Sequence, residues 1–253
     1  MAKEVRSQVG RLSELVLPAM LVALVVGAYW LKVRQASSVA GGAGPESTQA
    51  ILARGTSLHS AQEYDGALEA YRKVLEREPG HPQAHYNIGQ IYNTRGQYTQ
   101  AQMEYEAALK AEPQSLDARL NLGVVLYRQR QFEAAAAAFR QVLQASPRHP
   151  MGLFNLGVTL LELGQGDEAI RWLTAALRED PERPDAHYYL GRAMERQGRL
   201  SEARASLQKA VDLNPKLADA YTALARVYLA QGERQLALEA LAKAAELNAP
   251  PKR

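Results

Sequence analysis

A period of 34 residues is the feature that most constrains how this chain can fold. It is marked by prolines spaced 34 residues apart, namely Pro79, Pro113, Pro147, Pro181 and Pro215. If positions are counted from residue 48, position 20 of every repeat is alanine, and position 8 is glycine in all repeats but the last, which has Ala225. Self-similarity at such a period predicts stacked supersecondary units, each packed on its neighbours, rather than one globular core.

Each repeat is predicted to form two antiparallel helices. Small residues at positions 8 and 20 let the two backbones approach, and large apolar residues at position 24 fill the space around that contact: Tyr71, Tyr105, Phe139, Leu173, Leu207 and Leu241. Glycine at position 15 is expected to end the first helix in the repeats that carry Gly96, Gly164, Gly198 and Gly232. The proline at position 32 then stops the second helix, so the sequence predicts an all-α fold.

This pattern resembles the tetratricopeptide repeat (TPR) family. The resemblance is clearest in YNIGQIYNTRGQYTQAQMEYEAALKAEP (residues 86–113) and YYLGRAMERQGRLSEARASLQKAVDLNP (residues 188–215). It implies a right-handed α-solenoid of six helix pairs over residues 48–251, divided into 48–81, 82–115, 116–149, 150–183, 184–217 and 218–251. Because the repeats occupy most of the 253 residues, no room is left for a catalytic domain.

The segment before the repeats is predicted to hold a single transmembrane helix. Residues 15–31 read LVLPAMLVALVVGAYWL and carry no charge. At about 1.5 Å per residue this stretch spans about 26 Å, near the thickness of the hydrocarbon core of a bilayer. We therefore expect an N-terminal juxtamembrane segment at 1–14, a transmembrane helix at 15–34 and a flexible linker at 35–47.

A cleaved signal peptide is the alternative for the same segment. Its apolar stretch would be longer than usual, and Lys32 and Arg34 separate that stretch from the small residues at 38–40 that could be cleaved. Three basic residues precede the segment and two follow it within the tail, which favours a bacterial inner-membrane protein with its repeats on the periplasmic side. The cytoplasmic orientation stays open.

Small residues recur every four positions on the predicted membrane helix. Ala19, Ala23 and Gly27 form a ridge that could pack against another membrane helix. Small residues are also common in such helices without any packing role, and this plainer interpretation stays open.

Charge and composition exclude several functions. The net charge is +3, and because residues 1–47 carry more basic than acidic groups, the repeats are nearly neutral. This balance argues against a nucleic-acid partner. The chain has no cysteine and contains no GxxxxGK[ST], HExxH or GxSxG motif. Helix capping and packing are the expected roles of the histidines, so we predict no enzyme, no catalytic residue, no metal site and no cofactor.

The predicted functional surface is the concave groove lined by the first helix of each repeat. Position 6 is asparagine in three consecutive repeats, Asn87, Asn121 and Asn155. In the TPR family, inner-face asparagines grip the backbone of a bound peptide, and the resemblance implies that role here; bonding within their own helix is the alternative. The other candidate groove residues are Tyr86, Leu120, Val124, Tyr127, Phe154, Val158, Tyr188 and Arg192. Some of these aromatic residues could instead pack between repeats as core.

Two further observations restrict the kind of partner. The clamp with which chaperone-binding TPR proteins hold a terminal carboxylate needs lysine at positions 2 and 5, and no repeat has it. The last helix leaves Leu238 and Leu241 outside its polar stripe, so a partner or a second copy of the chain is expected to cover them. A homo- or hetero-oligomer through the last repeat is therefore predicted.

These features predict a membrane-anchored scaffold or adaptor that binds a peptide segment of partner proteins and organises an envelope or membrane complex. The chain resembles bacterial anchored TPR proteins used in pilus, cytochrome c or lipopolysaccharide assembly. It departs from the pilus pilotins, which use a lipidated cysteine, because it has no cysteine. The alternative is a constitutive structural subunit of a membrane complex, held through the transmembrane helix and the last repeat.

Overall fold

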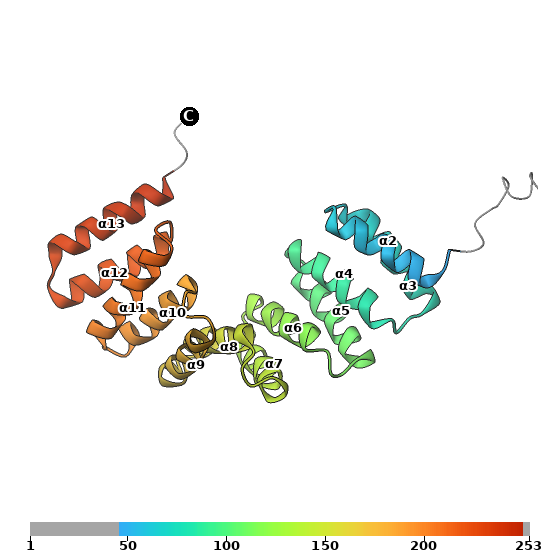
Figure 1. The fold of residues 1–253 in the computed structure, drawn as a ribbon, viewed down its shortest axis with the longest axis horizontal. Helices are drawn as coiled ribbons and strands as arrows, with labels where there is room; N and C mark the ends of the chain where they lie inside the picture. Colours follow the sequence, from blue (N-terminus) through green and yellow to red (C-terminus); the bar gives the residue numbers. More distant parts are fainter. Residues whose placement is uncertain (1–45, 250–253) are drawn as a thin grey trace, which may run out of the picture. The chain divides into compact units, whose positions relative to one another are not determined.

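A computed structural model of the chain describes residues 46–249. This part consists of helices without a strand, which confirms the all-α prediction there. The helices follow one another as neighbouring pairs (Figure 1). Their bounds are α2 Thr48–Ser60, α3 Tyr64–Arg77, α4 Pro82–Thr94, α5 Tyr98–Ala111, α6 Leu116–Arg128, α7 Phe132–Ala145, α8 Pro150–Glu162, α9 Gly166–Glu179, α10 Pro184–Arg196, α11 Leu200–Leu213, α12 Ala218–Gln231 and α13 Arg234–Asn248.

The chain divides into two units, Met1–Ser47 and Thr48–Arg253, and all the helices above belong to the second. The predicted juxtamembrane segment at 1–14 and transmembrane helix at 15–34, with Ala19, Ala23 and Gly27, lie outside the described residues, as does most of the predicted linker. Within residues 46–249, no helix is both long and apolar enough to cross a bilayer.

The contact inside each helix pair explains why position 8 is glycine. A methyl group built on Gly55, Gly89, Gly123, Gly157 or Gly191 would lie 2.5–2.8 Å from the side chain at position 24 of the same repeat. In the second repeat, for example, a Cβ atom on Gly89 would approach the ring of Tyr105 to 2.8 Å. The large residue at position 24 therefore occupies the space that the missing side chain leaves, and this fixes how closely the two helices pack.

The turn between the two helices of a repeat uses a left-handed backbone conformation at position 15. Gly96, Gly164, Gly198 and Gly232 have φ between 71° and 83°, which confirms their predicted role at the end of the first helix. Gln62 and Arg130 occupy the same position in the first and third repeats and also have φ of 62°. The sequence gives no direct sign of this, because a non-glycine residue rarely adopts that conformation.

The first helices α4, α6 and α8 are each capped by the side chain of the residue just before them. His81 Nδ1 accepts a hydrogen bond from the amide of Ala84, and His149 Nδ1 accepts one from the amide of Gly152. In the repeat between them, the hydroxyl of Ser115 does the same for α6. The expected capping role of these two histidines is confirmed, and proline follows each of them as the first residue of the helix.

The hydrophobic core is not uniform along the array. One continuous cluster of buried side chains runs from Leu126 to Ala240, and a second links residues between Ile51 and Ile91. Between them lies a small cluster of Ala101, Tyr105 and Val125, with further tyrosines packed around it. Contacts around the junction of the second and third repeats thus involve several aromatic rings that carry hydroxyl groups.

Candidate functional site

The first helices of neighbouring repeats approach one another, and the second helices do not. Among the described helices, α4 contacts α2 and α6, and α8 contacts α6 and α10, whereas no second helix contacts the second helix of the next repeat. The repeats are therefore closest together on the side of the first helices, as on the inner side of a curved repeat array. This is the side where the sequence placed the candidate groove.

The three asparagines of position 6 have different surroundings. Asn87 is 6% exposed and its Oδ1 accepts a hydrogen bond of 2.9 Å from Gln83, one turn earlier in the same helix. The amide of Asn121 donates to the hydroxyl of Tyr86 in the preceding repeat, at 3.1 Å. The Nδ2 atom of Asn155 is buried and has no hydrogen-bond partner among the described residues. Of the three, Asn155 therefore has a buried amide nitrogen that still lacks an acceptor.

Asn155 lies in a cavity of about 280 Å³ to which three successive first helices contribute. Five of the predicted groove residues line it: Val124, Tyr127, Phe154, Asn155 and Val158. Four residues that the sequence analysis did not select complete the lining, namely Arg128, Phe139, Thr159 and Tyr189. Tyr189 occupies position 6, the position of the asparagine row, so extending that row by one repeat would have found it.

Aromatic rings and one cation hold the wall formed by Phe154. The guanidinium of Arg183 lies 4.2 Å from the centre of the Phe154 ring, and the ring of Tyr189 meets Phe154 edge to face at 5.7 Å. Phe154 is only 8% exposed, so it belongs to the core as well as to the cavity. The alternative that some of these aromatic residues pack between repeats as core therefore applies in part to Phe154.

The phenols around the cavity remain protonated at neutral pH. Burial raises the pKa of Tyr189 to about 12, and the neighbouring Tyr127 adds to the shift. The pKa of Tyr127 is also raised, mainly by burial and then by the nearby carboxylate of Glu162. Both hydroxyl groups are therefore available as hydrogen-bond donors, and neither contributes a negative charge.

The remaining predicted groove residues lie to either side of this cavity. Tyr86 is half-buried, and its ring packs against Tyr105 at the junction of the second and third repeats. Leu120 is partly buried and packs on the main core. Tyr188 and Arg192 line a more polar cleft of about 540 Å³ towards the last repeats.

Two of the arginines that line this polar cleft are paired with carboxylates. Arg226 forms two hydrogen bonds with the carboxylate of Glu195, at 2.7 and 2.9 Å, and Arg192 lies 3.9 Å from Glu162. The pKa of Arg226 is raised, chiefly by its hydrogen bond to Glu195. Arg196, which also lines the cleft, donates instead to the backbone carbonyl of Leu161 at 2.7 Å. Because two of these arginines already have a carboxylate partner, this stretch offers less uncompensated charge to a ligand than its basic sequence suggests.

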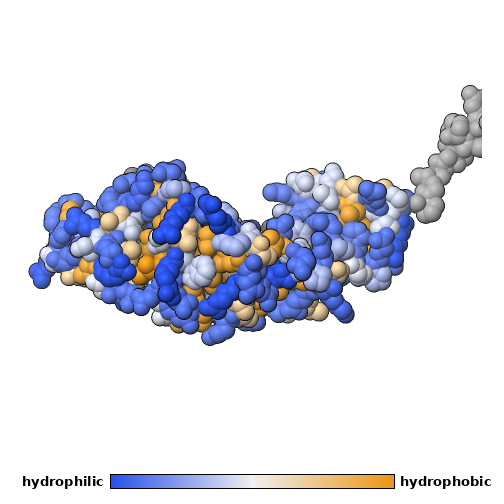
Figure 2. Space-filling view, turned by 60° about the horizontal axis from the view of Figure 1, so that its bottom comes forward, coloured by the Kyte–Doolittle hydropathy of each residue, from blue (hydrophilic) through white to orange (hydrophobic). Residues whose placement is uncertain are grey.

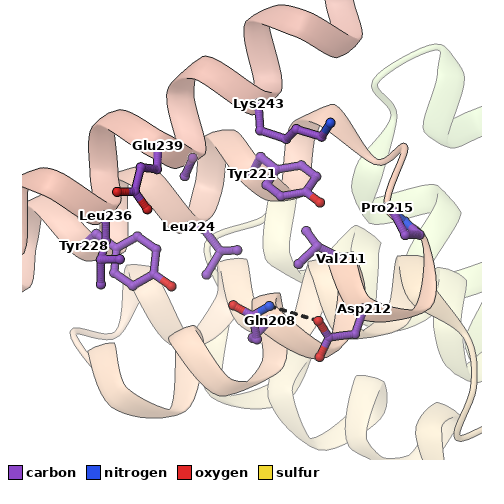
Figure 3. Close-up of a pocket in the computed structure, with 11 residues that line it drawn as sticks. Gln208, Val211, Asp212, Pro215, Tyr221, Leu224, Tyr228, Leu236, Glu239 and Lys243 are labelled. Carbon is purple, nitrogen blue, oxygen red and sulfur yellow. Dashed lines mark hydrogen bonds between the residues drawn. The ribbon is translucent and has the colours of Figure 1, made fainter.

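A further concavity lies between α11 and α13, over α12 (Figure 3). Its volume is about 540 Å³, and the side chains of Leu224, Tyr221 and Tyr228 face into it while Gln208 and Asp212 hydrogen-bond at its edge. Position 23 at this place is Ala240, whereas the fourth repeat has Trp172 there. Alanine also stands at position 23 in the first and third repeats, as Ala70 and Ala138, so that position by itself does not single out this cleft.

Apolar side chains are exposed at the end of the described array. Leu238 is 63% exposed and Leu241 is 42% exposed, whereas Leu207, at the same position 24 in the repeat before, is fully buried. On the face drawn in Figure 2, apolar residues lie in patches between polar ones along the array. Within residues 46–249, no group of three or more histidine, aspartate or glutamate side chains is arranged to hold a metal ion.

Comparisons with known proteins give one family and several similar folds. The sequence model of the family described as the Cilia and flagella-associated protein 70 C-terminal domain, a TPR domain, matches residues 20–252. No curated protein sequence matches the chain. Among solved structures, MamA (41-end) from Desulfovibrio magneticus RS-1 is 26% identical with a TM-score of 0.61, over 66% of this chain and 94% of its own.

Two further structures share the fold at lower identity. YrrB, described as a TPR protein with an unusual peptide-binding site, is 23% identical with a TM-score of 0.59, over 72% of this chain and 93% of its own. PilF of Pseudomonas aeruginosa is 20% identical with a TM-score of 0.68, over 79% of this chain and 91% of its own. Together these comparisons confirm the resemblance to tetratricopeptide repeats that the 34-residue period indicated.

Proposed function

Since the chain belongs to the TPR family of the Cilia and flagella-associated protein 70 C-terminal domain, we propose that it is a scaffold that binds a peptide segment of partner proteins. Stacked repeats of this kind present long concave surfaces, and such surfaces suit protein partners. The segment would lie along the first helices α4, α6, α8 and α10, within a right-handed array of the six repeats. The groove residues named from the sequence are its contacts in this proposal.

The observation that carries the proposal is the cavity around Asn155. This cavity on the first-helix side has both apolar and polar walls, and the buried Nδ2 of Asn155 in its lining has no hydrogen-bond partner among the described residues, so the cavity is incomplete as a piece of core. A buried donor that makes no hydrogen bond costs about 1–3 kcal/mol. A bound peptide would remove that cost by offering a backbone carbonyl to Asn155, while its side chains bury the apolar walls.

The proposal includes a membrane anchor at residues 15–34 and a role in organising an envelope or membrane complex. It is supported by the uncharged stretch 15–31 and by Tyr29 and Trp30 at one end of it, where amphipathic rings prefer the headgroup region. The periplasmic side of a bacterial inner membrane is the proposed location of the repeats. Carbonate extraction of membranes from cells, followed by protease protection of the repeats, tests both the anchor and the side.

Site-specific photo-crosslinking in intact cells tests the binding surface. A photoreactive amino acid at Leu120, on the first-helix side, should capture a partner, and the same probe at the exposed Glu133 of α7 should not. The crosslink from Leu120 should decrease when Asn121 and Asn155 are both changed to alanine. Equal products from Leu120 and Glu133, or none from Leu120, would contradict the proposed groove.

A constitutive structural subunit is the second candidate, and one observation favours it. Leu241 is exposed at position 24, which the five preceding repeats bury, and Leu238 of the same helix is exposed as well, as a surface covered by another subunit would be. In that case the Asn121/Asn155 double variant would leave assembly unchanged. Substitution of Leu238 and Leu241 by lysine would instead release the chain from its complex, which co-purification from detergent-solubilised membranes measures.

A further inference from the structure

We propose that the cavity between α6, α8 and α10 is a specificity pocket that takes one large apolar side chain from a peptide whose neighbouring residue is acidic. The inference rests on the proposed function, since it names the class of peptide that the groove selects. Three features of the cavity carry it: its size and walls, the free amide of Asn155, and the charge of Arg128.

The size and lining of the cavity suit a single side chain. Its volume of about 280 Å³ is below the range of about 300–1,000 Å³ that is usual for small-molecule and cofactor pockets. Val124, Phe139, Phe154 and Val158 supply apolar walls from two first helices and one second helix. An unbranched, branched or aromatic apolar side chain would bury most of its surface here, which is the largest favourable term open to a peptide at this place.

The polar groups of the cavity fix how the peptide backbone would lie. The hydroxyl of Thr159 is already used, because it donates to the backbone carbonyl of Asn155 at 2.6 Å. The Nδ2 atom of Asn155 is buried without a partner in the described part of the chain. Because this atom has almost no exposed surface, the Asn155 side chain would turn toward the cavity on binding and donate to a carbonyl of the peptide next to its apolar residue. The side chain and the carbonyl would then be recognised together.

The charge at the edge of the cavity selects the neighbouring residue. Arg128 lines the cavity and is exposed, and it makes no ion pair or hydrogen bond with any of residues 46–249. The arginines further along the groove differ, because Arg192 and Arg226 lie beside Glu162 and Glu195. A carboxylate on the ligand would be the counter-ion of Arg128, and its attraction is strengthened where the peptide excludes water.

Three synthetic peptides test the inference by fluorescence polarisation with the full chain in detergent micelles. Each has ten residues in a Gly/Ser background: one with Leu flanked by two Glu, one with Ala flanked by two Glu, and one with Leu flanked by two Lys. The Leu/Glu peptide should bind most tightly. Loss of the leucine side chain should weaken binding about 10-fold or more, and the change from Glu to Lys should weaken it about 3- to 10-fold.

Protein variants assign these effects to the cavity. Arg128→Glu should reverse the preference, so that the Leu/Lys peptide binds better than the Leu/Glu peptide. Asn155→Ala should weaken both leucine peptides by the same factor, about 3-fold or more. Arg178→Glu is the matched control, because Arg178 is exposed on the second helix α9 and the net charge changes equally. It should leave the preference unchanged, and circular dichroism checks that each variant is folded.

The outcomes separate this inference from the proposed function. Equal binding of the Leu/Glu and Leu/Lys peptides, with no response to Arg128→Glu, would overturn the acidic preference while the groove remained a peptide site. Failure of all three peptides to bind would overturn the proposed pocket. The crosslink from Leu120 would then decide whether the groove binds a peptide at all. A reversal by Arg128→Glu that Arg178→Glu does not reproduce would establish the inference.

Discussion

Two residues of the array lie in environments that do not suit their side chain or backbone conformation. Substitution at these positions should raise the stability of the fold. Tyr105 is fully buried, yet its hydroxyl has no hydrogen-bond partner in the described part of the chain. Gln62 adopts a left-handed backbone conformation that favours glycine. Both residues occupy a repeat position at which another repeat has the better-suited residue: Phe139 at position 24 and Gly96 at position 15.

Tyr105→Phe should raise the free energy of unfolding by about 1 kcal/mol, because it removes a buried hydroxyl without a partner and keeps the ring. Tyr86→Phe is the matched control. Its hydroxyl accepts hydrogen bonds from Asn121 and Gln90, both at 3.1 Å, so its loss should lower the free energy of unfolding. Chemical denaturation followed by circular dichroism measures both. A lower stability of Tyr105→Phe would mean that its hydroxyl is bonded in solution.

Gln62→Gly should raise the free energy of unfolding by about 0.5–1 kcal/mol. The gain comes from relief of the left-handed conformation at φ of 62°, reduced by the larger conformational entropy of glycine in the unfolded chain. Gln62→Ala separates this cause from loss of the side chain, since alanine keeps the unfavourable conformation and should bring no gain. Equal stability of the two variants would show that the conformation costs little here.

At the scale of the helix pair, one contact between positions 8 and 24 recurs in five repeats and determines how closely the helices pack. In the fifth repeat, a Cβ atom on Gly191 would lie 2.5 Å from Cγ of Leu207 and 3.1 Å from the carbonyl oxygen of Ala203. The backbone neighbour matters, because it cannot turn away as a side chain can. The last repeat has Ala225 at position 8, and its partner Leu241 is 42% exposed. Leu241 is thus less buried than the residues at position 24 of the preceding repeats, while Ala225 itself is buried.

Gly191→Ala should lower the free energy of unfolding by about 1–2 kcal/mol, because overpacking outweighs the higher helix propensity of alanine. Gly66→Ala is the control within a helix. Its new methyl group would meet only the end of the Leu58 side chain at 3.3 Å, so its stability should rise slightly. If Gly191→Ala is as stable as the original chain, helices α10 and α11 can separate without cost. A double-mutant cycle with Leu207→Ala would measure the coupling.

At the scale of the whole array, cooperativity should follow the continuity of the core. Repeat arrays gain stability from contacts between neighbours, so a weak junction separates the regions on its two sides. The main cluster begins at Leu126, and the cluster of the first repeats ends at Ile91. The small cluster around Tyr105 lies between them and includes a buried hydroxyl that has no hydrogen-bond partner in the described part of the chain.

Native-state hydrogen exchange should therefore show two levels of protection. Backbone amides of α2, α3 and α4 should exchange through an opening of lower free energy than amides of α8, α9 and α10, which lie within the main cluster. Mass spectrometry of peptides from the full chain, at increasing low concentrations of denaturant, resolves the two groups. A single opening free energy for all these helices would contradict a weak junction, and Tyr105→Phe should bring the two levels closer.

The 34-residue period by itself determined the helix pairs, their turns and the faces they bury. This was possible because each repeat packs only on its neighbours, so contacts such as Gly89 with Tyr105 recur at a fixed spacing and leave a visible pattern. The same pattern placed the asparagine row on the first helices. Whether residues 15–34 cross a membrane stays a prediction from the sequence.

The tertiary structure alone decided what each groove residue is free to do. Asn87, Asn121 and Asn155 are equivalent by sequence position, but Asn87 is bonded within its helix and Asn121 is bonded to Tyr86. Asn155 keeps a buried donor with no partner among residues 46–249. Likewise, Arg226 is paired with Glu195 while Arg128 is unpaired among the described residues. A hydrogen bond or an ion pair depends on which side chain of the adjacent repeat lies within reach, and the distance between side chains of different repeats follows from packing rather than from the period.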